Sequence, residues 1–265
     1  MQRVLGKKQR IKNQDWIDAM NRIEELVTKD ELADLEGRTI DSIKKFCKGK
    51  KVAYGWSGGK DSLALRYVCE QAGVKDCLLA ISDLEYPAFK CWCEENRPET
   101  CEIIDTKQNL EWLKQHPGML FPKSSKEAGQ WFHIVQHRGQ TKYYKDHGLE
   151  ALLVGRRHAD GNYCGSGKNY YTNGQGVTRF SPIADWPHEA VLACIHYHRI
   201  PMPPIYGWKN GYLCGTHPWP ARQWTENIEN GYSEVYDIDP SIVTEAAKVI
   251  DSANEFLKTL GKEVR

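Results

Sequence analysis

The chain has 265 residues, of which 40% are hydrophobic and 27% charged, and its formal net charge is +1. This length suits one large α/β domain with terminal additions, or at most two domains, and the apolar content is sufficient for a buried core. The small net charge argues against electrostatic binding of nucleic acids or membranes, and no stretch approaches the ~18 apolar residues that a bilayer-spanning helix needs.

The number and spacing of the cysteines indicate the cellular compartment in which the protein is expected. There are nine of them, an odd number at irregular spacing, which fits a secreted disulfide framework poorly. The N-terminus is basic but lacks the apolar core of an export signal. We therefore predict a cytoplasmic protein whose thiols are mostly reduced.

Residues 14–47 have a helical pattern, and after a polar connector at 48–51 short apolar runs alternate with amphipathic stretches up to residue 154. We expect helices over 14–47 with a break at Gly37, strands at 52–56, 77–82, 102–105 and 151–154, and further helices at 63–73, 88–95, 109–115 and 131–147. Strands that alternate with helices indicate an α/β fold with a doubly wound, mostly parallel sheet and helices on both faces.

The remainder of the chain is less regular. Residues 160–180 are rich in Gly, Asn, Tyr and Ser, and we expect a long functional or disordered loop there. A helix at 187–198, an irregular Pro/Gly/aromatic segment at 201–220 and an amphipathic helix at 240–260 are expected to follow. These patterns predict an N-terminal helical extension (1–49), a central α/β domain (50–225) and a C-terminal helical segment (226–265).

A glycine-rich string follows the first expected strand and precedes a helix: Ser57-Gly58-Gly59-Lys60-Asp61-Ser62. Ligands of open parallel sheets bind where a strand runs into a helix in this way. The two glycines let backbone N–H groups approach phosphate oxygens, the helix directs its positive dipole end at the anion, and the serines and lysine add donors. The spacing of the Walker motif is absent. We call residues 57–62 the phosphate loop.

The phosphate loop resembles the Ser-Gly-Gly-x-Asp-Ser signature of the PP-loop ATP pyrophosphatases, or nucleotide α-hydrolases. Within that superfamily the chain resembles the phosphoadenosine phosphosulfate (PAPS) reductase family. The supporting stretches are Ile-Ser-Asp-Leu-Glu-Tyr-Pro at 81–87, Val-Gly-Arg-Arg at 154–157, Ser-Pro-Ile-Ala-Asp-Trp at 181–186, and Pro-Ile-Tyr at 204–206 followed by Gly211-Tyr212. Together they cover about residues 50–222.

The resemblance implies an adenine nucleotide α-hydrolase-like fold with a nucleotide, ATP or PAPS, whose α-phosphate lies on the phosphate loop, and we expect Mg²⁺ with it. It implies that Asp83 lies near the adenosine half, although a helix cap is an equal alternative for this carboxylate. Arg156 and Arg157 would hold the anionic half, and Arg179 is a weaker candidate for the same role.

One departure from the family concerns a C-terminal cysteine. PAPS reductases carry a nucleophilic cysteine in a Glu-Cys-Gly-Leu-His motif near the C-terminus, whereas no cysteine follows Cys214 here. The paired cysteines that hold an iron–sulfur cluster in related reductases are also absent. We therefore expect nucleotide binding to be retained and sulfonucleotide reduction to be lost, unless a non-standard thiol such as Cys214 carries it.

Two groups of cysteines and histidines invite a metal interpretation: Cys91 and Cys93 with Cys101, and Cys194, His196 and His198 with Cys214 and His217. On a helix, Cys194 and His198 would share a face and could offer two ligands. Neither group has the Cys-x-x-Cys spacing of a zinc or iron–sulfur site. We predict no metal site and expect most of these thiols to pack as small apolar groups.

The leading functional hypothesis is an enzyme that acts at the α-phosphate of ATP, releasing pyrophosphate and either forming AMP or adenylating an acceptor. Lys60, Asp61 and Arg156 are the expected catalytic residues, and Cys214 would join them if sulfur chemistry occurs. The alternatives are PAPS reduction or sulfur transfer, and a nucleotide-binding protein without turnover. The expected partner is a small-molecule nucleotide, and the terminal helices could either pack on the core or mediate a homo-oligomer.

Overall fold

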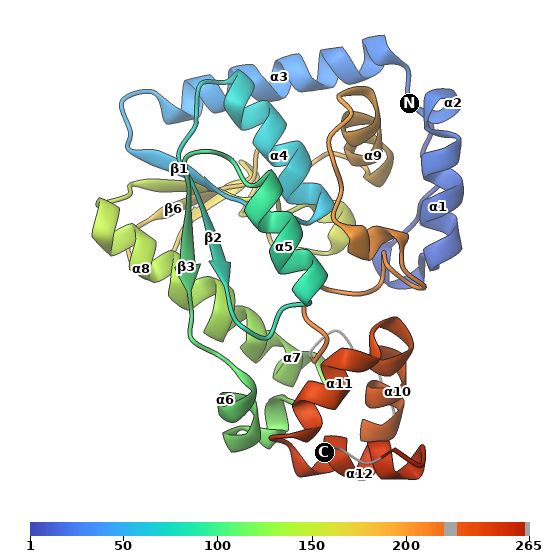
Figure 1. Ribbon diagram of the computed structural model, residues 1–265. Helices are drawn as coiled ribbons and strands as arrows, with labels where there is room; N and C mark the ends of the chain where they lie inside the picture. Colours follow the sequence, from blue (N-terminus) through green and yellow to red (C-terminus); the bar gives the residue numbers. More distant parts are fainter. Residues whose placement is uncertain (220–226, 263–265) are drawn as a thin grey trace. The chain divides into compact units, whose positions relative to one another are not determined.

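The structure, a computed structural model, describes residues 1–219 and 227–262. The chain divides into two compact units (Figure 1). The first consists of residues 1–79, 95–104 and 140–203, and the second of residues 80–94, 105–139 and 204 onward. The predicted boundary between residues 225 and 226 lies outside the described residues.

Within the described residues, six strands form one sheet in the order β3-β2-β1-β4-β6-β5. The strands are β1 (Val52–Gly55), β2 (Cys77–Ile81), β3 (Cys101–Asp105), β4 (Ala151–Leu153), β5 (Tyr170–Thr172) and β6 (Thr178–Phe180). β1 is parallel to both β2 and β4, β4 is parallel to β6, and β5 is antiparallel to β6. The predicted mostly parallel sheet is confirmed.

Helices cover both faces of this sheet in the first unit (Figure 1). Ala53 of β1 and Leu152 of β4 are buried with Tyr143 and Tyr144 of α8 (Arg138–His147). The next residue of β1, Tyr54, points to the opposite face, as strand geometry requires, and donates its hydroxyl to Glu70 of α4 (Lys60–Gln71) at 3.4 Å. α9 (His188–Tyr197) contacts α4 on that same face.

The N-terminal extension forms α1 (Asn13–Asn21), α2 (Ile23–Leu26) and α3 (Lys29–Cys47). The predicted break at Gly37 is wrong, because α3 continues through it. Thr28 and Glu31 form a capping box at the start of this helix, with N–H to side-chain distances of 3.0 and 3.3 Å. Burial of Leu32 and Ile43 on one face stabilises the helix by more than the ~1 kcal/mol that an interior glycine costs.

Residues 160–180 differ from the predicted loop. They contain the β5–β6 hairpin, whose turn is held by the Asn173 side chain, which accepts hydrogen bonds from the N–H groups of Gln175 and Val177 at 3.0 Å each. Gly176 has a φ of 78°, which glycine adopts readily. Each strand has only three residues, too few to produce a recognisable alternation in the sequence.

Among the described residues of the second unit, the regular elements are helices, apart from the ends of β2 and β3. It contains most of α5 (Pro87–Asn96), then α6 (Leu110–Gln115), α7 (Ser125–Trp131), a π-helix (Phe132–His137), α10 (Ile228–Ile238), α11 (Pro240–Ala247) and α12 (Asp251–Thr259). The single helix predicted at 240–260 is therefore two helices. The chain turns between them, so that Val243 and Ala246 can be buried along with Phe256 and Leu257.

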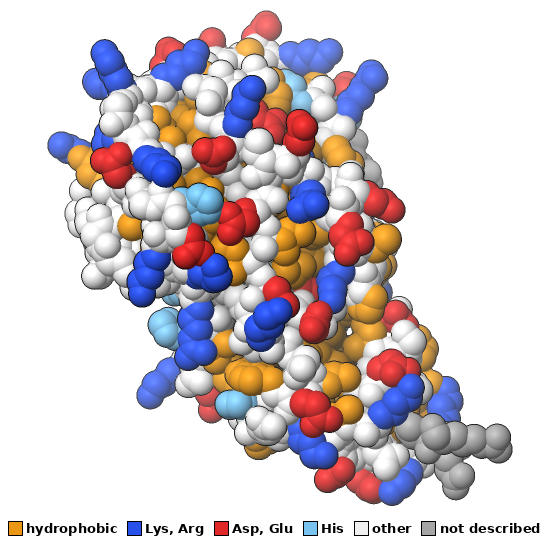
Figure 2. All heavy atoms as spheres, turned by 60° about the vertical axis from the view of Figure 1, so that its left-hand side comes forward, with side chains coloured by type: hydrophobic (Ala, Val, Ile, Leu, Met, Phe, Trp, Pro, Cys, Tyr) orange, Lys and Arg blue, Asp and Glu red, His pale blue; other side chains and the backbone are white. Residues whose placement is uncertain are grey.

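Surface charge is mixed on the face drawn in Figure 2, where Lys and Arg side chains are interspersed with Asp and Glu. This agrees with the net charge of +1. In the described part of the chain, no helix has both the length and the apolar character needed to cross a bilayer.

Candidate functional site

The phosphate loop joins β1 to α4 in the first unit. Gly58 has a φ of 66°, in the left-handed region that glycine adopts without strain. The Ser62 hydroxyl accepts a hydrogen bond from the Ser57 N–H at 3.1 Å and donates one to the Gly59 carbonyl at 2.8 Å. These bonds hold the backbone at the start of α4, where the helix dipole favours an anion.

The end of β4 approaches this loop closely. A Cβ atom on Gly155 would lie 3.1 Å from the carbonyl oxygen of Asp61 and 3.2 Å from its carbonyl carbon. Because these are backbone atoms in the first turn of a helix, they have little freedom to move away. A glycine at this position lets the chain after β4 pass close to α4, and Arg157, two residues later, contacts Asp61 of the phosphate loop.

Four charged side chains form a buried network beside the loop. Lys60 Nζ lies 3.0 and 2.8 Å from the two carboxylate oxygens of Asp61. Arg157, which is fully buried, donates its Nε–H to Asp61 Oδ1 at 2.8 Å and lies 2.9 Å from Asp160 Oδ2. Two carboxylates and two cations therefore balance within the network.

Burial and these partners change the pKa values in the network. Burial alone would raise the pKa of Asp61, but the Lys60 ammonium and the Arg157 guanidinium outweigh it and hold that pKa well below its usual value. Burial lowers the pKa of Lys60, and the neighbouring Asp61 carboxylate opposes this shift. Lys60 and Asp61 therefore form an ion pair in the first turn of α4.

His188 and Trp16 complete the surroundings of the network. The Nη2 group of Arg157 lies 3.0 Å from His188 Nδ1 and its Nη1–H is donated to the Trp186 carbonyl at 3.2 Å. Burial and the Arg157 charge lower the pKa of His188 to about 4, so the ring is neutral near pH 7 and Nδ1 can accept. Trp16 of α1 packs edge-on against His188 at 4.7 Å, and Lys60 Nζ lies 4.8 Å from its ring centroid.

The first residues of the chain also reach this region. The N–H groups of Val4 and Leu5 both donate to Glu189 Oε1 at 2.7 Å, and Glu189 is fully buried at the start of α9. Lys8 Nζ lies 3.4 Å from Asp160. The N-terminal segment is therefore connected to α9 and to the charged network.

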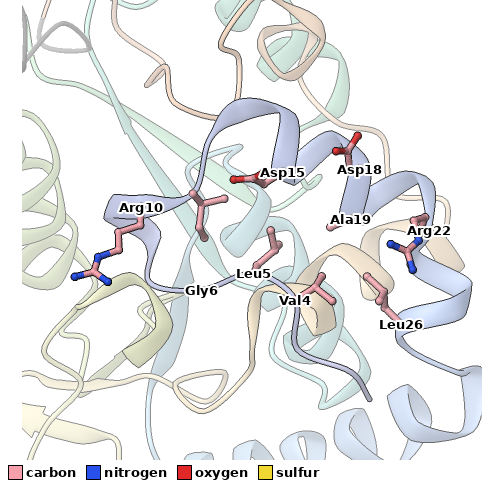
Figure 3. Close-up of a pocket in the computed structure, with 10 residues that line it drawn as sticks. Val4, Leu5, Gly6, Arg10, Asp15, Asp18, Ala19, Arg22 and Leu26 are labelled. Atoms are coloured by element: carbon pink, nitrogen blue, oxygen red, sulfur yellow. The ribbon is translucent and has the colours of Figure 1, made fainter.

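A small cavity adjoins this segment. It has a volume of about 230 Å³ and is lined by Val4, Leu5, Gly6, Arg10, Ile11, Asp15, Asp18, Ala19, Arg22 and Leu26 (Figure 3). Small-molecule sites usually enclose ~300–1,000 Å³. The cavity contains no residue of the phosphate loop, so we do not assign it to the nucleotide.

Two arginines, Arg156 and Arg179, lie beside Tyr171 near the carboxyl ends of β4 and β6. Arg156 donates from Nη1 to the Tyr171 hydroxyl at 3.1 Å, and Tyr171 is paired with Arg179 in the β5–β6 ladder. Arg179 is only 7% exposed and donates to Gln140 at 2.9 Å. Its Nε–H has no hydrogen-bond partner in the described part of the chain. Burial lowers the pKa of Arg179, yet a guanidinium stays charged at neutral pH.

Two predicted site residues, Asp83 and Cys214, belong to the second unit. Asp83 forms an exposed ion pair with Lys90 at 2.9 Å. Cys214 is half-buried. Near it in sequence, His217 lies 2.9 Å from the buried Glu85. The phosphate loop, Arg156, Arg157 and Arg179 thus all belong to the first unit, where Arg157 contacts the loop and Arg156 and Arg179 lie beside Tyr171, whereas Asp83 and Cys214 belong to the second unit.

Several residues of the network are not among the sequence predictions. Asp160 lies three residues after Arg157, a spacing that could have suggested the pair. His188 follows the Pro-Ile-x-x-Trp stretch as the first residue of α9. Trp16 and Lys8 come from the N-terminal extension, and no local pattern connects them to the loop.

The sequence matches the phosphoadenosine phosphosulfate reductase domain over residues 51–214. No curated protein sequence matches the chain. Among solved structures, the phosphoadenylyl-sulfate (PAPS) reductase from Candida auris in a phosphate complex is similar in fold, with 15% identity, a TM-score of 0.51, and 69% of this chain and 94% of that chain covered.

Two further solved structures are similar at 13% identity. NMN synthetase from Francisella tularensis has a TM-score of 0.49, with 85% of this chain and 92% of that chain covered. The NH3-dependent NAD synthetase from Campylobacter jejuni subsp. jejuni has a TM-score of 0.46, with 88% and 98% covered.

Proposed function

Since the chain belongs to the phosphoadenosine phosphosulfate reductase domain family, we propose that it is an enzyme that binds an adenine nucleotide and acts at its α-phosphate. With ATP, an acceptor atom or water attacks the α-phosphorus, the bond to the pyrophosphate oxygen breaks, and pyrophosphate leaves. The products are an adenylated acceptor or AMP, together with pyrophosphate.

The observation that carries this proposal is the locked geometry of the phosphate loop. Gly58 occupies a left-handed backbone conformation, and Ser62 fixes the turn by bonding to Ser57 and Gly59. An anion at the start of α4 would meet a preorganised set of donors. Lys60, at the same helix end, would share its charge between Asp61 and the α-phosphate.

We assign different roles to the two arginines after β4. Arg157 is buried and bonded to Asp61, Asp160 and the Trp186 carbonyl, so it positions the loop. Arg156 is half-buried, and with Arg179 it would hold the pyrophosphate or the equivalent anionic part of PAPS. The Nε–H of Arg179 is a buried donor that such an anion would satisfy.

Magnesium would accompany ATP, but most of the carboxylate oxygens of the charged network are already engaged by its cations. Both oxygens of Asp61 already accept from Lys60 and Arg157, and Asp160 Oδ2 lies against Arg157. Mg²⁺ usually combines one or two carboxylates with phosphate oxygens and waters. We therefore treat the ion as the counter-ion of the nucleotide and assign no step to it.

Product analysis tests the proposal. The purified chain is incubated with ATP, PAPS or adenosine phosphosulfate, and nucleotides, pyrophosphate and sulfite are measured. We expect AMP and pyrophosphate from ATP, whereas ADP and phosphate would contradict the proposal. Tight nucleotide binding without any product would favour the non-catalytic alternative.

A pair of glycine variants tests the role of the loop. Gly58→Ala strains a residue with a φ of 66°, and Gly73→Ala strains one with a φ of 87° at the other end of α4. Each should destabilise the fold by ~1–3 kcal/mol. Only Gly58→Ala should abolish nucleotide binding in calorimetry. Equal loss of nucleotide binding in both variants would contradict a direct role of the phosphate loop in binding the nucleotide.

The second candidate function is PAPS reduction or sulfur transfer, which the family match itself favours. Cys214, in a Gly-Tyr-Leu-Cys-Gly stretch, is the thiol we nominate for it. This candidate requires sulfite to form from PAPS in the presence of a dithiol donor, and Cys214→Ser to stop it. Absence of sulfite under reducing conditions would eliminate it.

A further inference from the structure

Glu36, Cys194 and His198 converge on one point between two helices of the first unit. Glu36 lies on α3, in the N-terminal extension, and the other two residues belong to α9 and its C-cap (Figure 1). Cys194 and His198 are four residues apart and therefore share a helix face. A ligand atom from each of the three residues lies within 4.8 Å of the other two.

The spacing of these atoms is close to that of a metal site. His198 Nε2 lies 2.9 and 3.1 Å from the two oxygens of Glu36. Ligands of a tetrahedral zinc ion, at bond lengths of about 2.0–2.2 Å for nitrogen and oxygen, are about 3.4 Å apart. The Glu36 oxygen and His198 Nε2 would need to move apart by only a few tenths of an ångström to hold the ion between them. The Cys194 sulfur lies within 4.8 Å of both.

The donor set and its burial favour zinc over harder cations. Thiolate and imidazole are ligands of zinc, whereas magnesium and calcium require mainly oxygen. Cys194 is fully buried, the Glu36 side chain is 8% exposed and that of His198 27% exposed. Glu36 and a Cys194 thiolate would together neutralise a divalent charge, and the exposed side leaves a fourth position for water.

The neighbouring Tyr67 of α4 orients the histidine. Its ring stacks on the His198 imidazole with centroids 3.7 Å apart and an interplanar angle of 18°. This contact restricts rotation of the imidazole and keeps Nε2 directed at Glu36. Side chains that orient a metal-bound histidine in this way commonly support its binding.

We propose that Glu36, Cys194 and His198 form a zinc-binding site that ties the N-terminal extension to α9. Binding releases the thiol proton of Cys194 to solvent and moves the Nε2 proton that His198 shares with Glu36 to Nδ1, or to solvent where both ring nitrogens carry one. It forms bonds from the ion to sulfur, Nε2 of His198 and a carboxylate oxygen of Glu36. α9 begins with His188 and Glu189, which contact the charged network and the N-terminal segment. The ion would therefore fix the helix that supports the phosphate loop.

The same helix contains a matched pair without a thiol. His196 Nε2 lies 2.9 Å from Glu24 Oε1, the same distance as His198 from Glu36. His196 and Glu24 are 39% and 70% exposed at their side chains. If the proposal is wrong, the His198 group is only a hydrogen-bonded ion pair like this one, with the Cys194 thiol as an additional donor to Glu36.

Metal titration of the full chain tests the site. The protein is stripped with a chelator, and Zn²⁺ or Co²⁺ is added under reducing conditions. We expect one ion per chain by elemental analysis, a thiolate-to-Co²⁺ charge-transfer band, and a Tm that rises with zinc. Substoichiometric metal, or a cobalt spectrum without the thiolate band, would overturn the proposal.

Variants distinguish zinc binding at this site from zinc binding by other thiols and histidines of the chain. Cys194→Ala and His198→Ala should lower zinc affinity by more than the ~10–100-fold that loss of a supporting residue causes. His196→Ala and Cys91→Ser, which alter an exposed histidine and an exposed cysteine, should leave it unchanged. Glu36→Gln retains the shape of the side chain and should lower affinity while the metal-free Tm stays within a few degrees. Equal zinc binding by Cys194→Ala and the parent chain would refute the site.

Discussion

Arg156 and Arg157 are adjacent in the chain, but their surroundings differ. Arg157 is fully buried and ion-paired with Asp61 and Asp160, whereas Arg156 is half-buried and bonded to Tyr171. Removal of one partner from a buried ion pair leaves an uncompensated charge, which costs much more than loss of a partly solvated contact. The two positions should therefore respond differently to the same substitution.

We predict that Arg157→Gln destabilises the protein by ~3–5 kcal/mol, because Asp61 and Asp160 lose their shared cation. Arg156→Gln should change stability by less than ~1 kcal/mol and weaken nucleotide binding by ~10–100-fold, the equivalent of one charge-assisted hydrogen bond. Urea unfolding and calorimetric titration with ATP measure the two effects. A stable Arg157→Gln protein with weakened binding would mean that Arg157 faces the ligand after all.

His188 should make stability depend on pH. Its pKa is lowered from 6.5 to about 4 in the fold, because burial and the Arg157 charge disfavour the protonated ring. As pH falls, His188 is therefore protonated in the unfolded chain before it is protonated in the folded one. The free energy of unfolding decreases as pH falls from 6.5 to 4. The full contribution is present above pH 6.5 and amounts to about 3 kcal/mol.

The measurement is urea unfolding at pH 7 and pH 4.5 for the parent chain and for His188→Gln. We expect the loss of stability between the two pH values to shrink by about 2 kcal/mol in the variant. His133→Gln, which alters an exposed histidine, should behave as the parent does. The same pH dependence in all three proteins would show that His188 does not titrate abnormally.

At the scale of residues, the sequence indicated where the charges gather but not how they pair. Gly-Arg-Arg after a strand predicted two cations near the phosphate loop, and both lie in the first unit with that loop. The burial of Arg157 depends on Trp186 and on His188, about 30 residues further along the chain. Similarly, Trp16 packs beside Lys60 although they are 44 positions apart in the sequence. Contacts between residues so far apart in the chain produce no local sequence pattern from which they could be predicted.

At the scale of elements, the contact between β4 and α4 determines the geometry of the loop. Gly155→Ala would place a methyl group 3.1–3.2 Å from the carbonyl of Asp61. We predict that it destabilises the protein by ~1–3 kcal/mol and also weakens nucleotide binding, because the start of α4 must shift.

Gly37→Ala is the matched control. Gly37 lies in the interior of α3, and a Cβ there would meet nothing within 4 Å. The substitution should stabilise the protein by ~0.5–1 kcal/mol, since alanine loses less backbone freedom on folding. Thermal unfolding of both variants provides the comparison. A neutral Gly155→Ala would indicate that β4 and α4 can separate without cost.

The elements that could be predicted from the sequence are the long, periodic ones. The helices around the sheet have enough residues to show apolar periodicity, and β4, although only three residues long, is an uninterrupted apolar run. The β5–β6 hairpin could not be predicted, because its three-residue strands mix polar and apolar residues and its stability comes from the Asn173 turn and from pairing of β6 with β4. The separation of α11 from α12 likewise depends on packing between the two helices, which a continuous amphipathic pattern does not reveal.

At the scale of the whole molecule, each unit is assembled from segments that are distant in sequence. The N-terminal segment illustrates this arrangement within the first unit. Val4 and Leu5 bind Glu189, about 185 positions away, and Lys8 lies beside Asp160. The segment thus closes the chain onto α9, and the N–H groups of Val4 and Leu5 share one buried carboxylate as their acceptor.

We predict that Glu189→Ala releases this segment, because the N–H groups of Val4 and Leu5 lose a charge-assisted acceptor that is worth about 1.5–3 kcal/mol per bond. Hydrogen exchange of residues 4–8 should become at least tenfold faster. Nucleotide affinity should fall more modestly, since Lys8 then leaves Asp160.

Two further variants show whether the carboxylate itself is responsible. Glu189→Gln retains an oxygen at the Oε1 position and should keep the segment attached, and Glu24→Ala, which removes an exposed carboxylate that pairs with His196, should have no effect. If residues 4–8 exchange equally fast in the parent chain and in Glu189→Ala, the segment is not held by Glu189. The charged network would then have to be stabilised without the N-terminal segment, and removing Lys8 would leave nucleotide binding unchanged.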